Sequence, residues 1–127
     1  MASLNTGSLR WAVVVVDLDP TSGHEQAGQR RALVVSYEPF HRFGLLTVCP
    51  ITAARGEARY PGDVVLPVGV AGQMKPGVVI CSQLRTISVS RIRGGPVGNL
   101  TDAGLRRRVR LALAHHLGLD IPAAVDA

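Results

Sequence analysis

Helical periodicity is confined to the last third of this chain, so one terminal helix is the main helical element that any fold of it can contain. Thr101 can cap this helix, and Asp102 suits the positive charge at its N-terminal end. Gly118 can end the helix, and residues 121–127 are expected to form a frayed tail. The apolar side chains that recur at helical spacing are Leu105, Val109, Ala112, Leu113 and Leu117.

The preceding two thirds of the chain consist of short apolar runs separated by glycine, proline and polar residues. Val13 to Val16 is an unbroken β-branched run, which is typical of a buried strand. Pro50 lies within another run and indicates an edge strand or a bulge. This order predicts a mostly β domain with a terminal helix (α+β), either a small antiparallel barrel or a curled sheet with the helix packed on it. The predicted strands are 12–17, 32–36, 45–51, 63–66 and 78–81, with helical turns at 38–43 and 88–91.

The length of 127 residues fits one domain, expected to span residues 1–127 with its core at about 10–119. No apolar run approaches the ~18 residues of a membrane span. The N-terminus lacks the basic start and apolar stretch of a secretory signal. The chain is therefore expected to work in the cytoplasm, away from membranes.

The chain is basic, with 14 Lys and Arg against nine Asp and Glu, a net charge of +5 and a pI of about 10.2. Every basic residue except Lys75 is arginine, whose fork matches phosphate and carboxylate groups and stacks on bases. Such a surface attracts nucleic acid, an acidic protein or anionic lipid. The alternative is an arginine-rich surface that is merely solvated.

The loop GHEQAGQR, residues 23–30, is the densest polar stretch of the chain. His24 can move protons near neutral pH, and Arg30 can hold a phosphate and stabilise negative charge in a transition state. Such groups can cleave RNA without a metal, because the ribose 2′-hydroxyl attacks the neighbouring phosphate. The alternative is a solvated loop whose polar residues only make turns.

Polar residues also follow two of the predicted strands. The Thr52 hydroxyl can donate to a phosphate, or it can simply end its strand by bonding the backbone. Arg85, two residues after Gln83, can bind phosphate or form a structural ion pair.

The cysteines and the remaining histidines give no sign of a metal site. Cys49 and Cys81 each lie in an apolar run and are expected to be buried and inert. His115 and His116 are adjacent, so one is expected to pack against the core and the other to face solvent. No Cys or His cluster has ligand spacing, and neither a metal nor another cofactor is predicted.

Taken in order, these segments resemble the MazF/PemK toxins of bacterial toxin–antitoxin pairs. The resemblance runs from about residue 10 to residue 119, and the GHEQ spelling is closest to the Kid/PemK/ChpB branch. The segments that carry it are DLDP (17–20), GHEQAGQR (23–30), VCPIT (48–52), VVICSQLRTI (78–87) and a terminal helix ending in LGL (117–119).

The resemblance implies an SH3-like barrel of the CcdB/Kid/MazF type that acts as a homodimer. It also implies a metal-independent endoribonuclease that cuts single-stranded RNA, often mRNA, at a short motif and so inhibits translation and growth. Attack by the 2′-hydroxyl would leave 2′,3′-cyclic phosphate and 5′-hydroxyl ends. The expected partners are RNA and an antitoxin with an acidic tail that covers the site.

Residue by residue, the resemblance makes Arg30 and Thr52 the catalytic pair and His24 a residue that stabilises the transition state. Gln83 and Arg85 match an element near the dimer interface. The residues expected to contact RNA are Glu25, Gln26, Gln29, Arg31, Ala53, Arg55, Gln83 and Arg85.

The chain departs from the family pattern at four positions. Ile80 and Ser82 stand where Kid-like members have an Arg and an Asp with acid and base roles, so His24, Glu25 and Arg30 remain candidates for the base. Arg31 replaces a usual Pro, and Trp11 stands at a usual Gly, which is expected to alter the first turn. Two other readings stay open: a CcdB-like toxin that binds gyrase, and a degenerate member that binds RNA or antitoxin without cutting.

Overall fold

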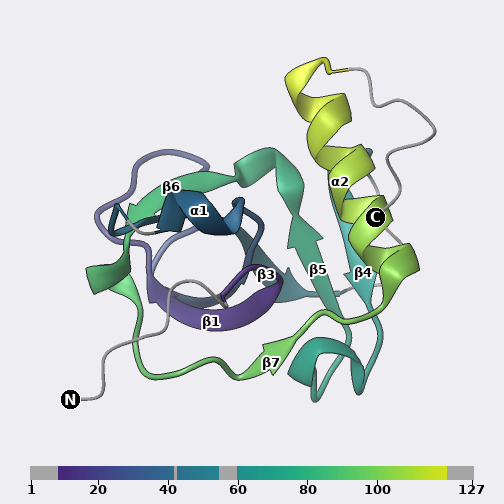
Figure 1. The fold of residues 1–127 in the computed structure, drawn as a ribbon, viewed down its shortest axis with the longest axis horizontal. Coiled ribbons are helices and arrows are strands. Elements are labelled where there is room, and N and C mark those ends of the chain that lie inside the picture. The colour runs from purple at the N-terminus through teal and green to yellow at the C-terminus, as the bar shows by residue number, and fades with distance from the viewer. Residues whose placement is uncertain (1–8, 42, 55–59, 120–127) are drawn as a thin grey trace.

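The computed structural model describes residues 9–41, 43–54 and 60–119, which form a strongly curled sheet with one long helix packed on it (Figure 1). The predicted class, mostly β with a terminal helix, is confirmed. The strands are β1 (Ala12–Asp17), β2 (Gln29–Val34), β3 (Leu45–Ala53), β4 (Asp63–Leu66), β5 (Gly77–Ile80), β6 (Arg85–Ser88) and β7 (Gly98–Asn99). The helices are α1 (Glu38–His41) and α2 (Ala103–Leu117), with single 3-10 turns η2 (Val70–Gly72), η3 (Cys81–Gln83) and η4 (Val89–Arg91).

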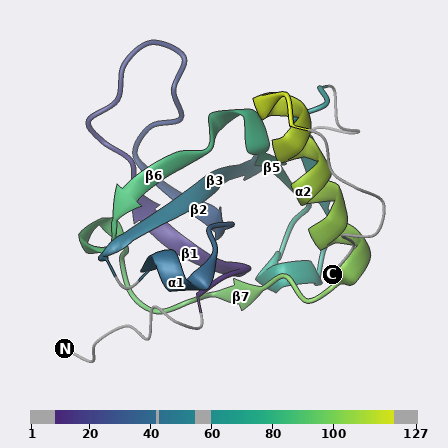
Figure 2. The same ribbon diagram turned by 45° about the horizontal axis from the view of Figure 1, so that its top comes forward.

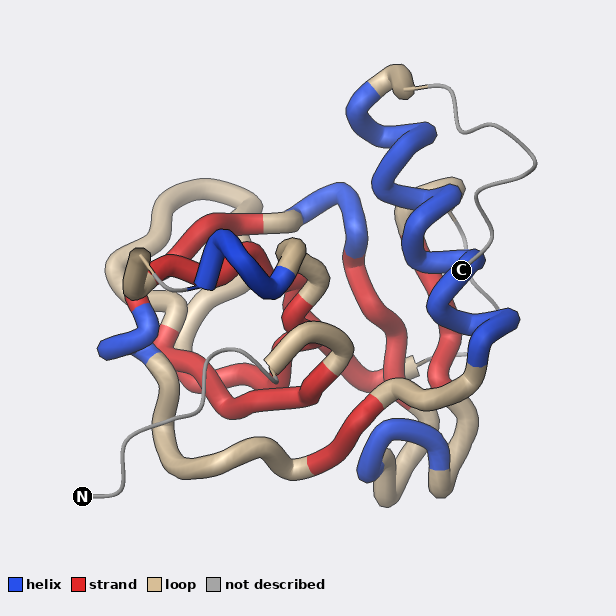
Figure 3. Tube along the Cα trace, in the orientation of Figure 1, coloured by secondary structure: helices blue, strands red, loops and turns tan. Residues whose placement is uncertain are grey.

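All pairings in the sheet are antiparallel, in the order β4-β5-β3-β2-β1-β7 with β6 added on β3. The nine-residue β3 is the centre of this arrangement, because it pairs with β2, β5 and β6. Figure 3 shows the strands wrapping around a common interior, with α2 standing against one side.

Of the two alternatives predicted at Pro50, an edge strand or a bulge, the edge strand is wrong, because Pro50 lies in this central strand. Val48 is the last residue of β3 to pair with β6, and Ile51 is the first to pair with β5. Pro50 therefore falls between the segment of β3 that pairs with β6 and the segment that pairs with β5. The N–H that proline lacks is not needed there, because neither strand pairs with β3 at this position.

Two apolar cores lie on opposite faces of the sheet, which explains the unbroken valine run of β1. Val13 belongs to the core beneath α2, together with Val109 and Ala112. Val14 and Val16 belong to the second core, inside the curl. Successive side chains of a strand point to opposite faces, so a strand covered on both faces has no polar alternation.

The terminal helix has a different cap from the one expected. The carboxylate of Asp102, and not the Thr101 hydroxyl, accepts the N–H of Leu105 at 2.8 Å. Gly118 ends α2 in the left-handed conformation, as predicted. His115 and His116 are both exposed, so the expectation that one packs into the core is wrong. The predicted tail, 121–127, lies outside the described residues.

Trp11 shows how a bulky side chain occupies the first turn. Its φ is +71°, the left-handed region that favours glycine. The side chain is buried, and the guanidinium groups of Arg10 and Arg106 lie 5.2 and 5.5 Å from its ring centre. Burial, followed by repulsion from Arg110, lowers the pKa of Arg10 below its usual value. Core packing and cation–π contacts therefore hold an unfavourable backbone conformation.

Candidate functional site

Arg30 and Thr52 lie on neighbouring strands and face the same hollow. The structure starts β2 at Gln29 and extends β3 to Ala53, beyond the predicted ends of both strands, so the two residues lie within the sheet and not in loops. Ala32 pairs with Pro50 in an antiparallel arrangement. Arg30 lies two residues before Ala32, and Thr52 lies two residues after Pro50, so the same register places them opposite each other. The pair that the resemblance implied is thus brought together by strand register.

This hollow, which we call the arginine hollow, has a volume of about 500 Å³ and a strongly basic wall. Three cationic side chains contribute to it, and none of the described residues that line it is acidic. Such a surface favours an anion. Its described lining comprises Gln29, Arg30, Arg31, Ile51, Thr52, Ala53, Gln73, Met74, Lys75 and Pro76.

Lys75 is the cation that sequence reasoning missed. It lies between β4 and β5, in a segment for which the sequence predicts no site. Gln73 is 8% exposed, and its Nε2 donates to the carbonyl of Lys75 at 3.2 Å, which fixes the backbone there. Its Oε1 is buried and has no hydrogen-bond partner among the described residues. Lys75 is the one lysine of the chain, which was the only sign of it in the sequence. No local sequence pattern connects Lys75 with Arg30.

Arg30 and Arg31 use their side chains differently. Arg30 is exposed, and only its Nε is engaged by the contact that the structure records, a 3.2 Å hydrogen bond to the carbonyl of Ala27. Arg31 is half-buried and donates from Nη1 to the carbonyl of Gly72 at 3.0 Å. Arg30 therefore offers its terminal N–H groups to a ligand, whereas one end of Arg31 is tied to η2.

The long loop between β1 and β2, residues 18–28, projects beyond the ends of these two strands (Figure 2). His24, Glu25 and Gln26 line a second hollow of about 400 Å³, the loop hollow. Pro50 forms part of its floor. Alternate residues of a strand point to the same side, so Thr52 lies on the same side of β3 as Pro50, about 7 Å further along. The described lining is Leu18, His24, Glu25, Gln26, Val48, Pro50, Ser82, Gln83, Leu84 and Arg85.

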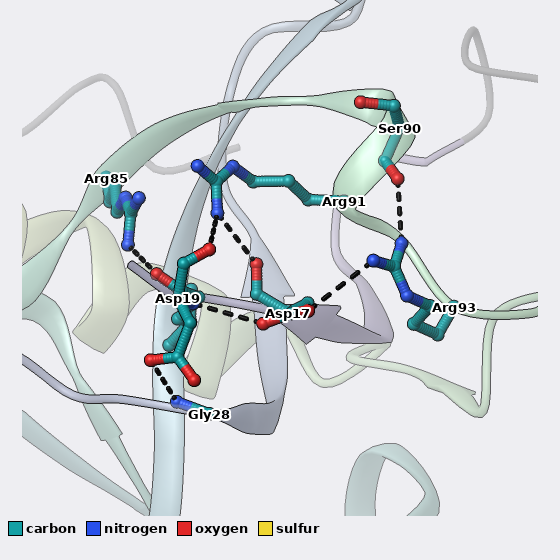
Figure 4. A network of polar contacts seen from close by, with 8 residues as sticks. Asp17, Asp19, Gly28, Arg85, Ser90, Arg91 and Arg93 are labelled. Atoms are coloured by element: carbon teal, nitrogen blue, oxygen red, sulfur yellow. Dashed lines mark hydrogen bonds and ion pairs between the residues drawn. The ribbon is translucent and has the colours of Figure 1, made fainter. Parts of the chain in front are cut away.

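The base of the loop is anchored by arginines from the other end of the chain (Figure 4). Arg85 donates to the carbonyl of Leu18 at 2.6 Å. Arg91 donates to the carbonyls of Asp17 and Asp19 at 3.1 and 2.6 Å. Arg93 forms a 3.5 Å ion pair with the Asp17 carboxylate. The group that Arg85 binds is a backbone carbonyl, so the structure shows no ion pair to a carboxylate at Arg85 among the described residues.

Gln83 holds the distal half of the loop. Its Oε1 accepts the N–H of Gln26 at 2.8 Å, and its Nε2 donates to the carbonyl of His24 at 3.3 Å. Both polar atoms of the side chain are therefore used within the protein. Gln83 and Arg85 therefore line the loop hollow and also hold the loop in place.

The three candidates for a general base differ in what their side chains contact. Oε1 of Glu25 accepts the N–H and the hydroxyl of Ser22, both at 3.1 Å. Arg30 carries a guanidinium, which does not lose its proton in proteins. The His24 imidazole is exposed and makes no hydrogen bond within the described part of the chain. His24 and Glu25 therefore each keep a group that can accept a proton, whereas Arg30 does not.

The remaining expectations concern other parts of the chain. Arg55 lies outside the described residues. Ile80 is half-buried at the end of β5, and Ser82 is exposed on η3. Cys49 and Cys81 are fully buried, as predicted, and their contact together with burial raises the pKa of the Cys49 thiol. In the described ranges, no group of three or more His, Cys, Asp or Glu side chains could hold a metal ion, and no helix is long and apolar enough to span a membrane.

Comparison with known proteins decides the family. Residues 9–117 match the model of the PemK-like, MazF-like toxins of type II toxin–antitoxin systems. The chain belongs to this family. The match covers both hollows and the whole of α2, so the PemK/MazF-like fold includes every element described above.

Individual members of the PemK/MazF-like family agree with this assignment. The Escherichia coli endoribonuclease PemK is 44% identical over 87 residues, which are 68% of this chain and 64% of PemK. A MazF crystal structure from Deinococcus radiodurans superposes with a TM-score of 0.72 at 32% identity, covering 86% of this chain and 94% of that one. A MazE–MazF structure from the same organism matches with a TM-score of 0.67 at 31% identity, covering 87% and 96%. The alignment with PemK thus spans slightly less than two thirds of that relative.

Proposed function

We propose that this protein is the toxin of a toxin–antitoxin pair and acts as an endoribonuclease on single-stranded RNA. The observation that carries the proposal is the arginine hollow, where Arg30 and Thr52 share a wall with Lys75 and no described acidic residue. A phosphodiester brought there would be neutralised by fixed cations. Related proteins bear the name endoribonuclease, which supports the same activity.

The reaction we propose is transfer of the phosphate to the neighbouring ribose hydroxyl. The 2′-hydroxyl gives its proton to His24 and its oxygen bonds to phosphorus. The bond from phosphorus to the 5′-oxygen breaks, and that oxygen takes a proton from solvent. Arg30 binds the phosphate oxygens, and the Thr52 hydroxyl donates to them. The products are a 2′,3′-cyclic phosphate and a 5′-hydroxyl.

The described residues also support the remaining expected contacts. Gln29, Arg31 and Ala53 line the arginine hollow, while Glu25 and Gln26 line the loop hollow. An RNA strand following this face of β3 would pass them in turn. The net charge of +5 would draw such a strand from solution.

We propose further that the protein is a cytoplasmic homodimer and that an antitoxin with an acidic tail covers the arginine hollow. The charge of the hollow suits acidic side chains as well as phosphates. Competition between antitoxin and RNA follows, because both would use the same cations. Simultaneous binding of antitoxin and an uncleavable RNA without mutual weakening would contradict this arrangement.

The experiment is cleavage of a long single-stranded RNA by the purified protein in EDTA, with the product ends identified by mass spectrometry. Cuts at one short motif with cyclic phosphate ends are expected. Arg30→Ala should lower the rate on the order of a hundredfold or more while the fold is kept. Absence of cutting by the folded wild-type protein, across RNAs that contain all short motifs, would overturn the proposal and favour a protein target or a degenerate member.

A further inference from the structure

A third hollow, of about 380 Å³, lies beside η3, whose Ser82 contributes to its wall. We call it the helix-end hollow because the last turn of α2 forms one wall. Ser82 lines both this hollow and the loop hollow, so the two adjoin across a single exposed residue. Its described lining is Tyr60, Pro61, Gly62, Ser82, His115 and His116.

Tight packing beside η3 shapes this hollow. The N–H of Cys81 donates to the carbonyl of Gly62 at 2.6 Å. A Cβ at Gly62 would lie 3.1 Å from the Cβ of Ser82, so a side chain there would push the 60–62 segment away. Gly118 ends α2 two residues after His116, which leaves both imidazoles exposed at the rim.

The chemistry of this lining differs from that of the arginine hollow. It contains three rings, two imidazoles and a phenol, beside one hydroxyl, and none of the described lining residues is Arg, Lys, Asp or Glu. Tyr60 is 69% exposed, so its ring is available to a ligand. Rings with polar edges suit the stacking and hydrogen bonding of a planar heterocycle.

We propose that the helix-end hollow binds an unpaired nucleobase of the RNA substrate, a few nucleotides from the scissile phosphate. The inference rests on the ribonuclease function proposed above. The strand would leave the loop hollow over Ser82 and place one base among Tyr60, His115 and His116. The rings would stack on the base, and the imidazole and hydroxyl groups would hydrogen-bond its edge.

The test uses RNA oligonucleotides that contain the cleaved motif, with a 2′-deoxy nucleotide at the cut so that they bind without reacting. A fluorescent 2-aminopurine is placed at successive positions on either side of the cut. Stacking in the hollow should quench it at one position with the wild-type protein. The quenching should disappear with Tyr60→Ala combined with His115→Ala and His116→Ala, and Tyr60→Phe should largely keep it.

A second measurement removes the base instead of the rings. An abasic nucleotide at the quenched position should weaken wild-type binding roughly tenfold and leave the affinity of the triple variant unchanged. Arg108→Ala, an exposed change on the same helix outside the hollow, is the matched control. It should lower affinity equally for the abasic and the intact RNA.

The outcomes separate the two proposals. Normal cutting at a motif with no position that couples to the three rings would overturn the helix-end subsite and leave the ribonuclease intact. Coupling that Arg108→Ala reproduces would overturn it as well. A wild-type protein that neither binds nor cuts RNA would overturn both. Circular dichroism melting of each variant confirms that losses come from binding and not from unfolding.

Discussion

The Oε1 atom of Gln83 accepts the backbone N–H of Gln26 at 2.8 Å, although the two residues are 57 positions apart in the chain. The same side chain donates to the carbonyl of His24. One amide group thus holds the loop segment that carries the proposed base over its hollow.

Gln83→Ala should reduce cleavage about tenfold through kcat, because the loop loses two hydrogen bonds that orient His24. The unfolding free energy should fall by only about 1–2 kcal/mol, since the loop is exposed. Steady-state kinetics beside denaturant unfolding measures both quantities. Gln83→Glu keeps the acceptor for Gln26 and should retain more activity than the alanine variant. Equal losses in the two would mean that the contact with Gln26 does not position the loop.

Thr52→Val should lower the cleavage rate by roughly tenfold to a hundredfold, because the shape is kept while the hydroxyl that would donate to the phosphate is lost. Thr52 pairs with Val78 inside the sheet, and valine suits a strand, so stability should hardly change. Single-turnover cleavage measures the rate, and thermal melting measures the stability. Unchanged cleavage would remove Thr52 from the proposed reaction.

His24→Gln should lower kcat/KM roughly a hundredfold, because glutamine cannot accept the proton of the 2′-hydroxyl. Steady-state cleavage by the variant and the wild-type protein provides the comparison. Glu25→Gln is the control, because the two bonds from Ser22 fall on Oε1 of Glu25 and glutamine keeps that oxygen. A larger loss in the control than in His24→Gln would assign the base to Glu25.

Much of this architecture can be predicted from the sequence, and the failures have physical causes. The valines of β1 and the periodicity of α2 identify a buried strand and a terminal helix, because both patterns are local. The position of Pro50 in a central strand cannot be predicted from the local sequence. It depends on where along β3 the pairing with β6 ends and the pairing with β5 begins. Lys75 joins Arg30 only through the pairing of β3 with β5, which no short-range pattern encodes.

Trp11→Gly should destabilise the protein by about 2–4 kcal/mol. Loss of a buried indole costs ~3–5 kcal/mol, and relief of the left-handed conformation at φ +71° returns about 1 kcal/mol. Burial therefore outweighs strain. Chemical denaturation measures the difference, and Trp11→Phe, which keeps an aromatic ring, should lose less. A glycine variant as stable as the wild type would mean that the strain and the packing are equal.

Stability should decline as pH rises above about 8.5, the usual pKa of a thiol. The pKa of Cys49 is raised by its contact with Cys81 and by burial, so the folded state keeps a proton that the unfolded state loses. The contribution of this thiol is complete below pH 8.5 and falls by up to about 1.4 kcal/mol per pH unit above it. Unfolding at pH 7.5 and pH 9.5 should show the decline, and Cys49→Ala should lessen it. An equal slope in the variant would assign the effect to other groups.

Two stretches of sequence that are far apart in the chain form one structural unit here. Arg85 and Arg91 bind the backbone carbonyls of Asp17, Leu18 and Asp19. A change in the backbone path at residues 17–19 would break these bonds unless the segment 85–91 moved with it. Replacing the loop of residues 18–28 alone with the loop of a relative would transfer the relative's loop sequence without the residues that hold the loop in its conformation. A chimera intended to acquire a relative's cutting motif must therefore receive both stretches together.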